Sequence, residues 1–356
     1  MNVLHVIPSL DYGGAARQLV LLATGLPREQ FACRVCVLGK AGPWAERLAA
    51  AAVPVRSLRR QRLLDLPFLR GLLEEVRQGP ADVLHVWGLP ALRWVAAAAL
   101  GRGRRIVVSE PWAGRPSRRR PGRLDRWLLR RADRVVAGSA AEAERCRRAG
   151  VDESRLVVIP AGVEPPSPRP ASPPARELPA GRLLVSVGPL ARHRGHRDAL
   201  WTVDILRYLY GDLQLALVGQ GPEEDYLRRF ARAADISDRV HFLGPQPEVR
   251  EWLERADVVW VPSAWAGGDL AALEAMAAGR PVVATTLPEL TELVSEGETG
   301  FLVPPGDKAA LARQTRRLLD DAELRRRMGE AGRRRAAERF AAADMVRRYA
   351  EVYAGR

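Results

Sequence analysis

The sequence predicts an α/β protein built from two doubly wound, Rossmann-like domains that face each other across a cleft. The first observation is length, because 356 residues are too many for one small hydrophobic core and fit two domains of ordinary size. The second is that short, continuous apolar runs alternate with helical patterns, which is typical of a parallel sheet covered on both faces. The third is a Pro-rich stretch near the middle, after which the same alternation starts again.

The first half shows this alternation from its first residues onward. Short apolar runs predict strands, and a helical pattern follows most of them. The predicted strands are Val3–Ile7, Phe31–Leu38, Val83–Val86, Ile106–Ser109, Arg134–Ala137 and Leu156–Ile159, and the predicted helices are Ala15–Leu26, Leu89–Leu100, Leu124–Arg131 and Ala140–Ala149.

Residues 164–179 are predicted to be a linker, because their many prolines favour an extended, semi-rigid chain. The linker divides an N-terminal domain, 1–163, from a C-terminal domain, 180–335. In the second half the predicted strands are Leu183–Val187, Gln214–Val218, Val240–Leu243, Val258–Val261 and Val282–Ala284. The predicted helices end near Tyr210 and Ala234 or span Val249–Ala256, Leu270–Ala278, Ala309–Leu319 and most of Arg333–Tyr353.

The net charge of +14 lies almost entirely in the first half. Residues 1–165 carry 28 basic and 15 acidic side chains, whereas residues 166–356 carry 28 and 27. A basic half indicates an anionic surface or substrate on that side of the molecule. No apolar run is long enough to span a membrane, and the first residues lack the pattern of a signal peptide. We therefore expect a cytoplasmic protein, with peripheral contact at the inner face of the membrane as a further possibility.

Cys33 and Cys36 form a C-x-x-C pattern inside a predicted strand. Positions three apart on a strand point to opposite faces, and no second Cys/His pair completes a zinc site. We expect two packing cysteines and no metal site.

Glycine-rich turns follow several of the predicted strands and precede helices. Glycine allows close approach of the backbone to a ligand, and a helix N-terminus offers free N–H groups to an anion, so these turns suit a diphosphate. Neither a GxGxxG fingerprint nor a P-loop is present, which disfavours a dehydrogenase. The turns contain Gly13 and Gly14, Gly188 with Gly195, Gly219 with Gly221, and Gly267 with Gly268.

More specific blocks occupy residues 257–307: Asp257–Ser263, Leu273–Ala284 and Gly297–Asp307. In these blocks, and in Val218–Glu223 and Ala132–Ser139 upstream, the chain resembles glycosyltransferase family 4, retaining nucleotide-sugar transferases of the GT-B fold. The blocks follow the family's order over nearly the whole chain.

The resemblance implies that the C-terminal domain holds a nucleoside-diphosphate sugar. Glu274 matches the second Glu of the family's E-x7-E motif and would contact the ribose of the donor, while Arg194 matches a phosphate-binding Lys. The other donor-site residues would be Gly188, Gly195, Gly219, Gly221, Gly267, Gly268, Asp269 and Leu270. Metal-independent chemistry without a cofactor is expected, with cations and helix dipoles stabilising the leaving diphosphate.

The N-terminal domain would bind the acceptor, which is a glycan, a lipid-linked sugar or a small molecule. Gly13 and Gly14 would approach the donor phosphates, with Arg17 beside them. His85 and Trp87 follow a strand and would line the cleft, although simple packing explains them equally well. The resemblance also implies that a terminal helix, 336–356, packs back on this domain.

Several positions depart from the family pattern and keep other functions open. Ala266 stands where the first Glu of E-x7-E belongs, Pro189 replaces a phosphate-binding Arg, and Pro288 replaces a Gly. The alternatives are a non-catalytic nucleotide-sugar-binding or scaffold protein and, less favoured, a sugar-nucleotide epimerase.

Arginines surround an apolar stripe, Leu124, Trp127 and Leu128, in a predicted helix. A packed helix with a solvated basic face explains it, and so does a surface for anionic lipid headgroups. Nucleic-acid binding is disfavoured because no recognised module accompanies the charge. His193 and His196, which flank Gly195, are expected at the surface.

Overall fold

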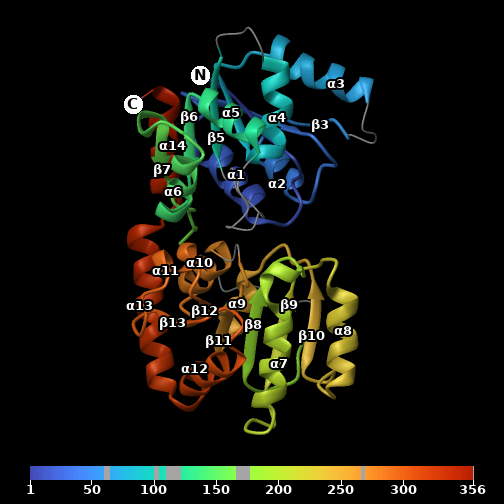
Figure 1. Ribbon diagram of the computed structural model, residues 1–356, viewed down its shortest axis with the longest axis vertical. Helices are drawn as coiled ribbons and strands as arrows, with labels where there is room; N and C mark the ends of the chain where they lie inside the picture. The colour runs from blue at the N-terminus through green and yellow to red at the C-terminus, as the bar shows by residue number, and fades with distance from the viewer. Residues whose placement is uncertain (60–64, 100–103, 110–121, 166–176, 266–268, 356) are drawn as a thin grey trace. The chain divides into compact units, whose positions relative to one another are not determined.

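A computed structural model describes residues 1–59, 65–99, 104–109, 122–165, 177–265 and 269–355. The chain divides into two compact units, Met1–Gly162 with Ala342–Arg356, and Val163–Ala341 (Figure 1). Most of the predicted Pro-rich linker, residues 166–176, lies outside the described residues.

The first unit is a seven-stranded sheet in the order β3-β2-β1-β4-β5-β6-β7, with every neighbouring pair parallel. Its strands are β1 (Asn2–Ile7), β2 (Ala32–Val37), β3 (Val55–Ser57), β4 (Val83–Trp87), β5 (Arg105–Ser109), β6 (Arg134–Ala137) and β7 (Leu156–Val158). Its helices are α1 (Gly14–Gly25), α2 (Trp44–Ala50), α3 (Leu66–Leu73), the π-helical turn η1 (Glu74–Gln78), α4 (Gly88–Ala99), α5 (Arg123–Arg131), α6 (Ala140–Arg148), the 3-10 turn η2 (Glu153–Arg155) and α14 (Ala342–Ala354).

The second unit is a six-stranded sheet in the order β10-β9-β8-β11-β12-β13, again parallel throughout. Its strands are β8 (Leu183–Val187), β9 (Gln214–Val218), β10 (Val240–Gly244), β11 (Val258–Val261), β12 (Val282–Thr285) and β13 (Gly300–Val303). Its helices are the 3-10 turn η3 (Arg192–Arg194), α7 (His196–Leu206), α8 (Glu224–Ala233), α9 (Arg250–Arg255), α10 (Asp269–Ala277), α11 (Pro288–Leu293), α12 (Lys308–Asp320) and α13 (Ala322–Arg339).

Apolar clusters lie on both faces of the first sheet, as continuous apolar strands require. Strand β2 illustrates the alternation, because Val35 and Val37 join one cluster and Cys36 joins the other. Cys33 packs on the Val35 side, so the two cysteines point to opposite faces and both are free thiols. Burial raises the pKa of the Cys36 thiol to about 12, which keeps it protonated and unreactive. The prediction of packing cysteines is confirmed.

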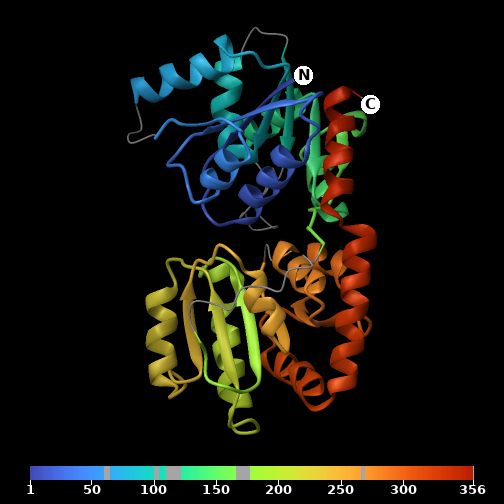
Figure 2. The ribbon, with the colours of Figure 1, turned by 180° about the vertical axis from the view of Figure 1, so that it is seen from behind.

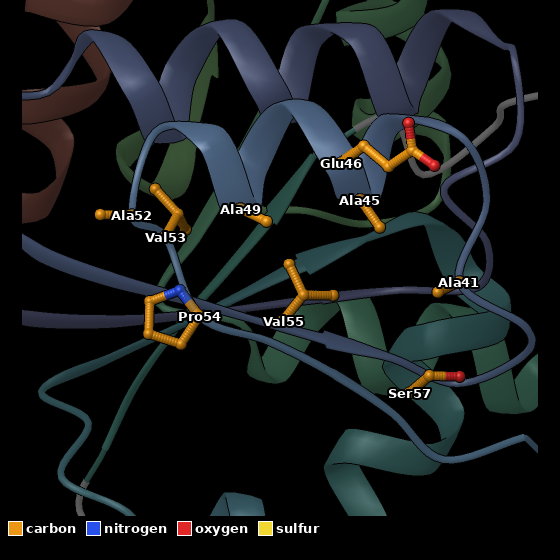
Figure 3. A pocket seen from close by; sticks show the side chains of 9 residues that line it. All are labelled: Ala41, Ala45, Glu46, Ala49, Ala52, Val53, Pro54, Val55 and Ser57. Atoms are coloured by element: carbon orange, nitrogen blue, oxygen red, sulfur yellow. The ribbon is translucent and has the colours of Figure 1, made fainter.

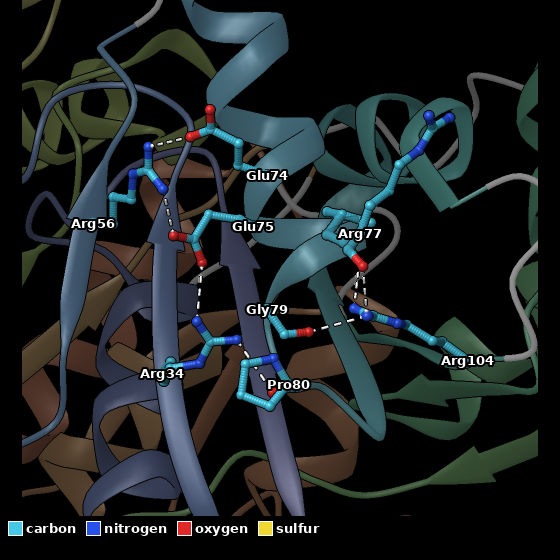
Figure 4. A network of polar contacts seen from close by, with 9 residues as sticks. Arg34, Arg56, Glu74, Glu75, Arg77, Gly79, Pro80 and Arg104 are labelled. Carbon is cyan, nitrogen blue, oxygen red and sulfur yellow. Dashed lines mark hydrogen bonds and ion pairs between the residues drawn. The ribbon is translucent and has the colours of Figure 1, made fainter.

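The sequence patterns did not predict the segment between β2 and β4. There η1, which continues from α3, is attached to β2 and β3 by ion pairs (Figure 4). Arg56 on β3 bonds Glu75 at 2.8 Å and Glu74 at 3.0 Å, and Arg34 on β2 bonds Glu75 at 3.2 Å. The guanidinium of Arg104 donates to main-chain carbonyls at the end of η1. These tertiary contacts hold η1 against the sheet, whereas α3 begins at a local signal, the Asp65 N-cap, which accepts a 3.1 Å hydrogen bond from the N–H of Phe68.

The terminal helix differs from the single helix expected over 336–356. Helix α13 ends at Arg339, and α14 begins at Ala342 and returns to the unit that holds the N-terminus (Figures 1 and 2). Met345, Tyr349, Val352 and Tyr353 of α14 join the core formed by β1 and α1. Where the chain leaves the first unit, the side-chain amide of Gln18 exchanges two 2.8 Å hydrogen bonds with the main chain of Gly162. Across the described residues, no helix combines the length and apolar content needed to cross a membrane.

Candidate active site

The strand order of each sheet locates a binding edge. In open parallel sheets, ligands bind beyond the carboxyl ends of the strands, where the direction of winding reverses. In the second unit the reversal lies between β8 and β11, and in the first it lies between β1 and β4. The segments that follow β8 and β11 contain Arg194 and Asp269, and the turn after β1 contains Gly13 and Gly14.

The turns after β8 and β9 pack directly against each other. The main-chain N–H of Gly188 donates to Val218 O at 2.9 Å, and that of Leu190 donates to Gln220 O at 3.0 Å. Gly219 has φ +138°, and a Cβ there would lie 2.1 Å from the carbonyl oxygen of Gly188. The contact between the two turns therefore requires a glycine at position 219. Gly221 lies in the same contact, against the main chain of Leu190.

Arg194 ends the 3-10 turn η3 and is buried, with 7% of its surface exposed. Its Nη2 donates to Val187 O at 2.9 Å, and its guanidinium lies against Gly188. Within the described part of the chain, no hydrogen-bond acceptor meets its Nε. Burial lowers the pKa of Arg194, and the negative charge of Asp269 acts in the opposite direction. A buried guanidinium with an unused donor is suited to an anionic ligand.

Gly195 follows at φ +72°, and a Cβ there would lie 1.7 Å from the carbonyl oxygen of Pro262. The backbone of η3 also accepts a 2.7 Å hydrogen bond at His193 O from the N–H of Ala264. The segment after β11 thus holds η3 in place, and Gly195 makes this close approach possible.

His196 begins α7 and is only 2% exposed, so the expectation of a surface position is wrong for this histidine. Its Nδ1 lies 3.5 Å from Ser186 Oγ, and burial together with the charge of Arg194 lowers its pKa to about 3. His196 is a neutral support beside Arg194. Its position as the first residue of α7, directly after the strand–turn segment, is a signal that could have placed it here.

Glu274 lies on α10, a helix whose residues from Ala271 to Ala277 are all buried. The side chain is 8% exposed, which excludes a role as an ordinary solvated helix residue. A carboxylate in an otherwise apolar, buried helix is uncommon and marks a binding position. Asp269 is exposed at the first position of the same helix, and Leu270 is half-buried beside it. Gly267 and Gly268, together with Ala266, lie outside the described residues.

In the first unit, Gly13 and Gly14 are exposed at the N-terminus of the twelve-residue helix α1. Gly13 is the N-cap, and no side chain caps this end. A Cβ on Gly13 would have its nearest neighbour, Asp11 O, at 3.9 Å, so the space beside this turn is open. Arg17 lies one turn further on, with its guanidinium carbon 5.9 Å from the ring centroid of Trp44.

A family model described as "Glycosyl transferases group 1" matches residues 173–335, and a model described as "Glycosyltransferase Family 4" matches residues 12–166. Together the two matches cover most of the chain, which belongs to the group 1 / family 4 glycosyltransferases.

Three curated relatives illustrate the range of this family. N-acetyl-alpha-D-glucosaminyl L-malate synthase of Bacillus anthracis is 38% identical over 142 residues, 40% of this chain and 37% of the relative. Glycogen synthase of Mycobacterium tuberculosis is 30% identical over 77% of this chain and 65% of the relative. D-inositol 3-phosphate glycosyltransferase of Paenarthrobacter aurescens is 31% identical over 70% and 63%. The matched regions span less than two thirds of the length of these three relatives.

Solved structures share the fold over the full chain. Anabaena HepE in complex with UDP-glucose superposes with a TM-score of 0.84 at 21% identity and covers 100% of both chains. Sucrose-phosphate synthase from Thermosynechococcus elongatus gives 0.79 at 20% identity and covers 100% of this chain and 98% of the other. The predicted GT-B fold, with two doubly wound parallel sheets, is confirmed.

The structure corrects the predicted acceptor-side roles of His85 and Trp87. Their side chains are 0% and 2% exposed and lie in the core of the first unit. His85 Nδ1 lies 2.5 Å from Tyr353 Oη, and its Nε2 lies 2.7 Å from Ser109 Oγ. Because α14 brings Tyr353 over the end of β4, neither side chain is available to an acceptor. The packing explanation accounts for both.

One groove lies between α2 and the edge strand β3 (Figure 3). It has a volume of about 570 Å³ and is lined by four alanines together with Val53, Pro54, Val55, Ser57 and one charged residue, Glu46. None of the predicted site residues lines it. Among the described residues, no group of three or more His, Cys, Asp or Glu side chains is arranged to hold a metal ion.

Proposed function

We propose that this protein transfers a sugar from a nucleoside-diphosphate donor to an acceptor, with retention of configuration and without a metal. The observation that carries the proposal is that Arg194 follows β8, and Asp269 and Glu274 follow β11, the two strands that flank the switch point of the second sheet, in a chain of this glycosyltransferase family. Arg194 and Glu274 are charged yet nearly buried, and buried charges of this kind are expected at a functional site.

Each group has a chemical role in this proposal. Arg194 faces the diphosphate and stabilises the negative charge that grows on it as the sugar leaves. Glu274 accepts hydrogen bonds from neighbouring ribose hydroxyls, for which a carboxylate with two oxygens is well suited. The N-terminus of α10 adds a positive dipole end near phosphate oxygens.

The reaction needs no protein nucleophile. The bond from the anomeric carbon to the phosphate oxygen breaks, and a bond from that carbon to the acceptor oxygen forms on the same face. The acceptor proton passes to an oxygen of the leaving diphosphate, so charge and atoms balance. In this proposal Glu274 binds and orients the donor, and Arg194 stabilises the negative charge of the leaving diphosphate.

Calorimetric titration with UDP, GDP and ADP tests the donor site, and UDP is the first probe because Anabaena HepE binds it. We expect one nucleotide to bind and Arg194→Met and Glu274→Gln each to weaken it about 10- to 100-fold, the loss of one charge-assisted contact. The control is Arg313→Met, at an exposed position on α12. Absence of binding at millimolar nucleotide would favour the scaffold alternative, and interconversion of the donor sugar without an acceptor would favour the epimerase.

We further propose that the acceptor is lipid-linked and is reached at an anionic membrane surface through α5. The side chains of Leu124 and Trp127 are 56% and 44% exposed on this helix. Arg123, Arg130 and Arg131 are exposed around them, and the Arg131 guanidinium carbon lies 4.3 Å from the Trp127 ring centroid. Exposed apolar side chains among arginines fit the interface of anionic lipid.

Sedimentation with phosphatidylglycerol vesicles measures this contact. We expect binding that weakens as salt is raised, because the attraction to the lipid is screened. Replacing Leu124 and Trp127 together with glutamine should lower the partition coefficient about tenfold, since two partly exposed apolar side chains no longer insert. Trp201→Gln is the matched control, because Trp201 is 45% exposed in the other unit. Equal binding to neutral phosphatidylcholine vesicles would contradict the electrostatic part of the proposal.

A further inference from the structure

Helix α5 buries a different face from the one that its sequence pattern predicts. Leu124, Trp127 and Leu128 are spaced at i, i+3 and i+4 and form the expected apolar stripe. In the structure, however, Leu124 is 56% and Trp127 is 44% exposed. The buried residues are instead Asp125, Leu128 and Leu129, which have the same spacing one position further along the helix. One position corresponds to a rotation of about 100° about the helix axis.

Apolar burial alone would favour the other rotation of α5. The predicted face carries three apolar side chains, whereas the face that is buried carries two apolar side chains and a carboxylate. Aspartate is almost never fully buried unless it is paired, and Asp125 is only 1% exposed. A specific interaction of Asp125 must therefore select the face that packs against the core.

This interaction is a bidentate ion pair between Asp125 and Arg93 of α4. Arg93 Nε donates to Asp125 Oδ1 at 2.8 Å, and Arg93 Nη2 donates to Asp125 Oδ2 at 2.9 Å. Two parallel hydrogen bonds fix the orientation of both side chains and so give geometric specificity as well as energy. A helix turned by one position would take the carboxylate away from this partner.

The other end of α5 is held through its main chain. Arg155 Nη1 donates to the carbonyl oxygen of Arg130 at 2.9 Å and lies 3.4 Å from that of Ala132. These contacts act on the last turn of the helix, whereas the ion pair with Arg93 acts on the first. Loss of the ion pair is therefore expected to change the first two turns, which contain both Leu124 and Trp127.

We propose that Arg93 and Asp125 are positioning residues, whose ion pair keeps Leu124 and Trp127 turned outward to meet anionic lipid. The inference rests on the membrane contact through α5 that is proposed above. The exposed arginines of α5 lie around the two apolar side chains and suit lipid phosphates, which favours an anionic membrane as the partner. Without the ion pair, the first two turns would bury Leu124 and Trp127, and the surface would lose the side chains that insert.

Asp125→Asn tests the inference because charge and positioning predict opposite changes. The substitution keeps the size of the side chain, breaks the ion pair and makes the protein more positive. If Asp125 acted only through its charge, binding to phosphatidylglycerol vesicles would become tighter. We expect sedimentation to show a partition coefficient about tenfold lower, as for the double replacement of Leu124 and Trp127. Glu29→Gln, at an exposed position between α1 and β2, makes the same change of charge and should not weaken binding.

Asp125→Leu is the matched second variant. It also removes the ion pair and the same charge, but it makes the buried face, with Leu128 and Leu129, wholly apolar. This face should then stay buried, so that Asp125→Leu binds vesicles at least as tightly as the wild type. The thermal midpoints of the two variants show that each is folded. Equal loss of binding in both variants, or tighter binding of Asp125→Asn, would overturn the inference.

Maleimide labelling of Leu124→Cys measures the position of this side chain without vesicles. Adding Asp125→Asn should slow the reaction about tenfold, because a buried thiol is unreactive. The native thiols give a slow background, since Cys36 and Cys146 are buried and burial raises the pKa of Cys33 to about 11.

The two measurements separate the inference from the proposal on which it rests. A labelling rate that Asp125→Asn leaves unchanged or raises would overturn the positioning role, even for a wild-type chain that binds anionic vesicles. A wild-type chain that does not bind these vesicles would instead overturn the membrane contact itself.

Discussion

Replacing Glu274 with glutamine is expected to lower kcat/KM for sugar transfer about 10- to 100-fold. The substitution keeps the size of the side chain and removes its charge, so that the two charge-assisted hydrogen bonds that we propose to the donor ribose become weaker neutral ones. Such bonds contribute about 1.5–3 kcal/mol, which corresponds to this range of fold-change. The loss should appear mainly in KM for the donor, because the proposed contact with the ribose is made in the ground state as well as in the transition state.

Glu338→Gln is the matched control, since Glu338 is exposed on α13. The thermal midpoints of both variants separate a loss of fold stability from a loss of donor binding. An unchanged kcat/KM would mean that Glu274 only completes the packing of α10, and the donor site would have to be sought elsewhere.

The positions of the site loops followed from the sequence because they depend on local chemistry. Short apolar runs such as Leu183–Val187 and Gln214–Val218 predicted strands that match β8 and β9, and the glycines after them predicted tight turns. Parallel sheets then require that such turns meet at one edge. What the residues alone did not show is that Gly219 is held against the main chain of the turn after β8.

The environment of His85 could not be predicted in the same way. Its partner Tyr353 is 268 residues away in sequence, and only the return of α14 to the first unit brings the two together. The segment of α3 and η1 is a similar case, because its ion pairs with Arg34 and Arg56 join strands and a helix that no local pattern connects. Contacts between residues far apart in sequence determine both the environment of His85 and the position of η1, and local sequence patterns do not reveal such contacts.

Pro189 stands where the family pattern has a phosphate-binding Arg, and Arg192 and Arg197 are the nearby arginines that could replace that charge. Arg197 is held by Glu223 at 2.6 Å and its guanidinium carbon lies 3.8 Å from the ring centroid of Tyr226. Arg192 is exposed on η3, two residues from Arg194. We therefore propose Arg192, and not Arg197, as the second cation beside the diphosphate.

Acid stability is expected to increase when His5 is replaced with leucine. His5 is fully buried in β1, and burial lowers its pKa to about 3. In the unfolded chain its pKa is about 6.5. Between these two values the unfolded state binds a proton that the folded state does not, so the free energy of unfolding falls as pH falls from about 6.5 to 3. His85, which lies 5.1 Å from His5 between ring centroids, has its pKa lowered for the same reason and further by the charge of His5.

His5→Leu removes the loss of stability that a buried, neutral His5 causes in acid, and it reduces the corresponding loss at His85. At pH 4.5 the penalty of keeping His5 neutral is about 3 kcal/mol, at about 1.4 kcal/mol per pKa unit over two units, so after the loss of one weak hydrogen bond the variant should be more stable than the wild type by about 2 to 3 kcal/mol. At pH 7.5, where both imidazoles are neutral in either state, the two chains should differ by less than about 1 kcal/mol, because only a 3.4 Å hydrogen bond from Trp87 Nε1 is lost. Urea unfolding at the two pH values measures the difference. Val3→Ala, at a buried position without a titrating group in the same strand, should lower stability equally at both. A change for His5→Leu that is the same at pH 4.5 and 7.5 would show that the buried imidazole is not what limits this unit in acid.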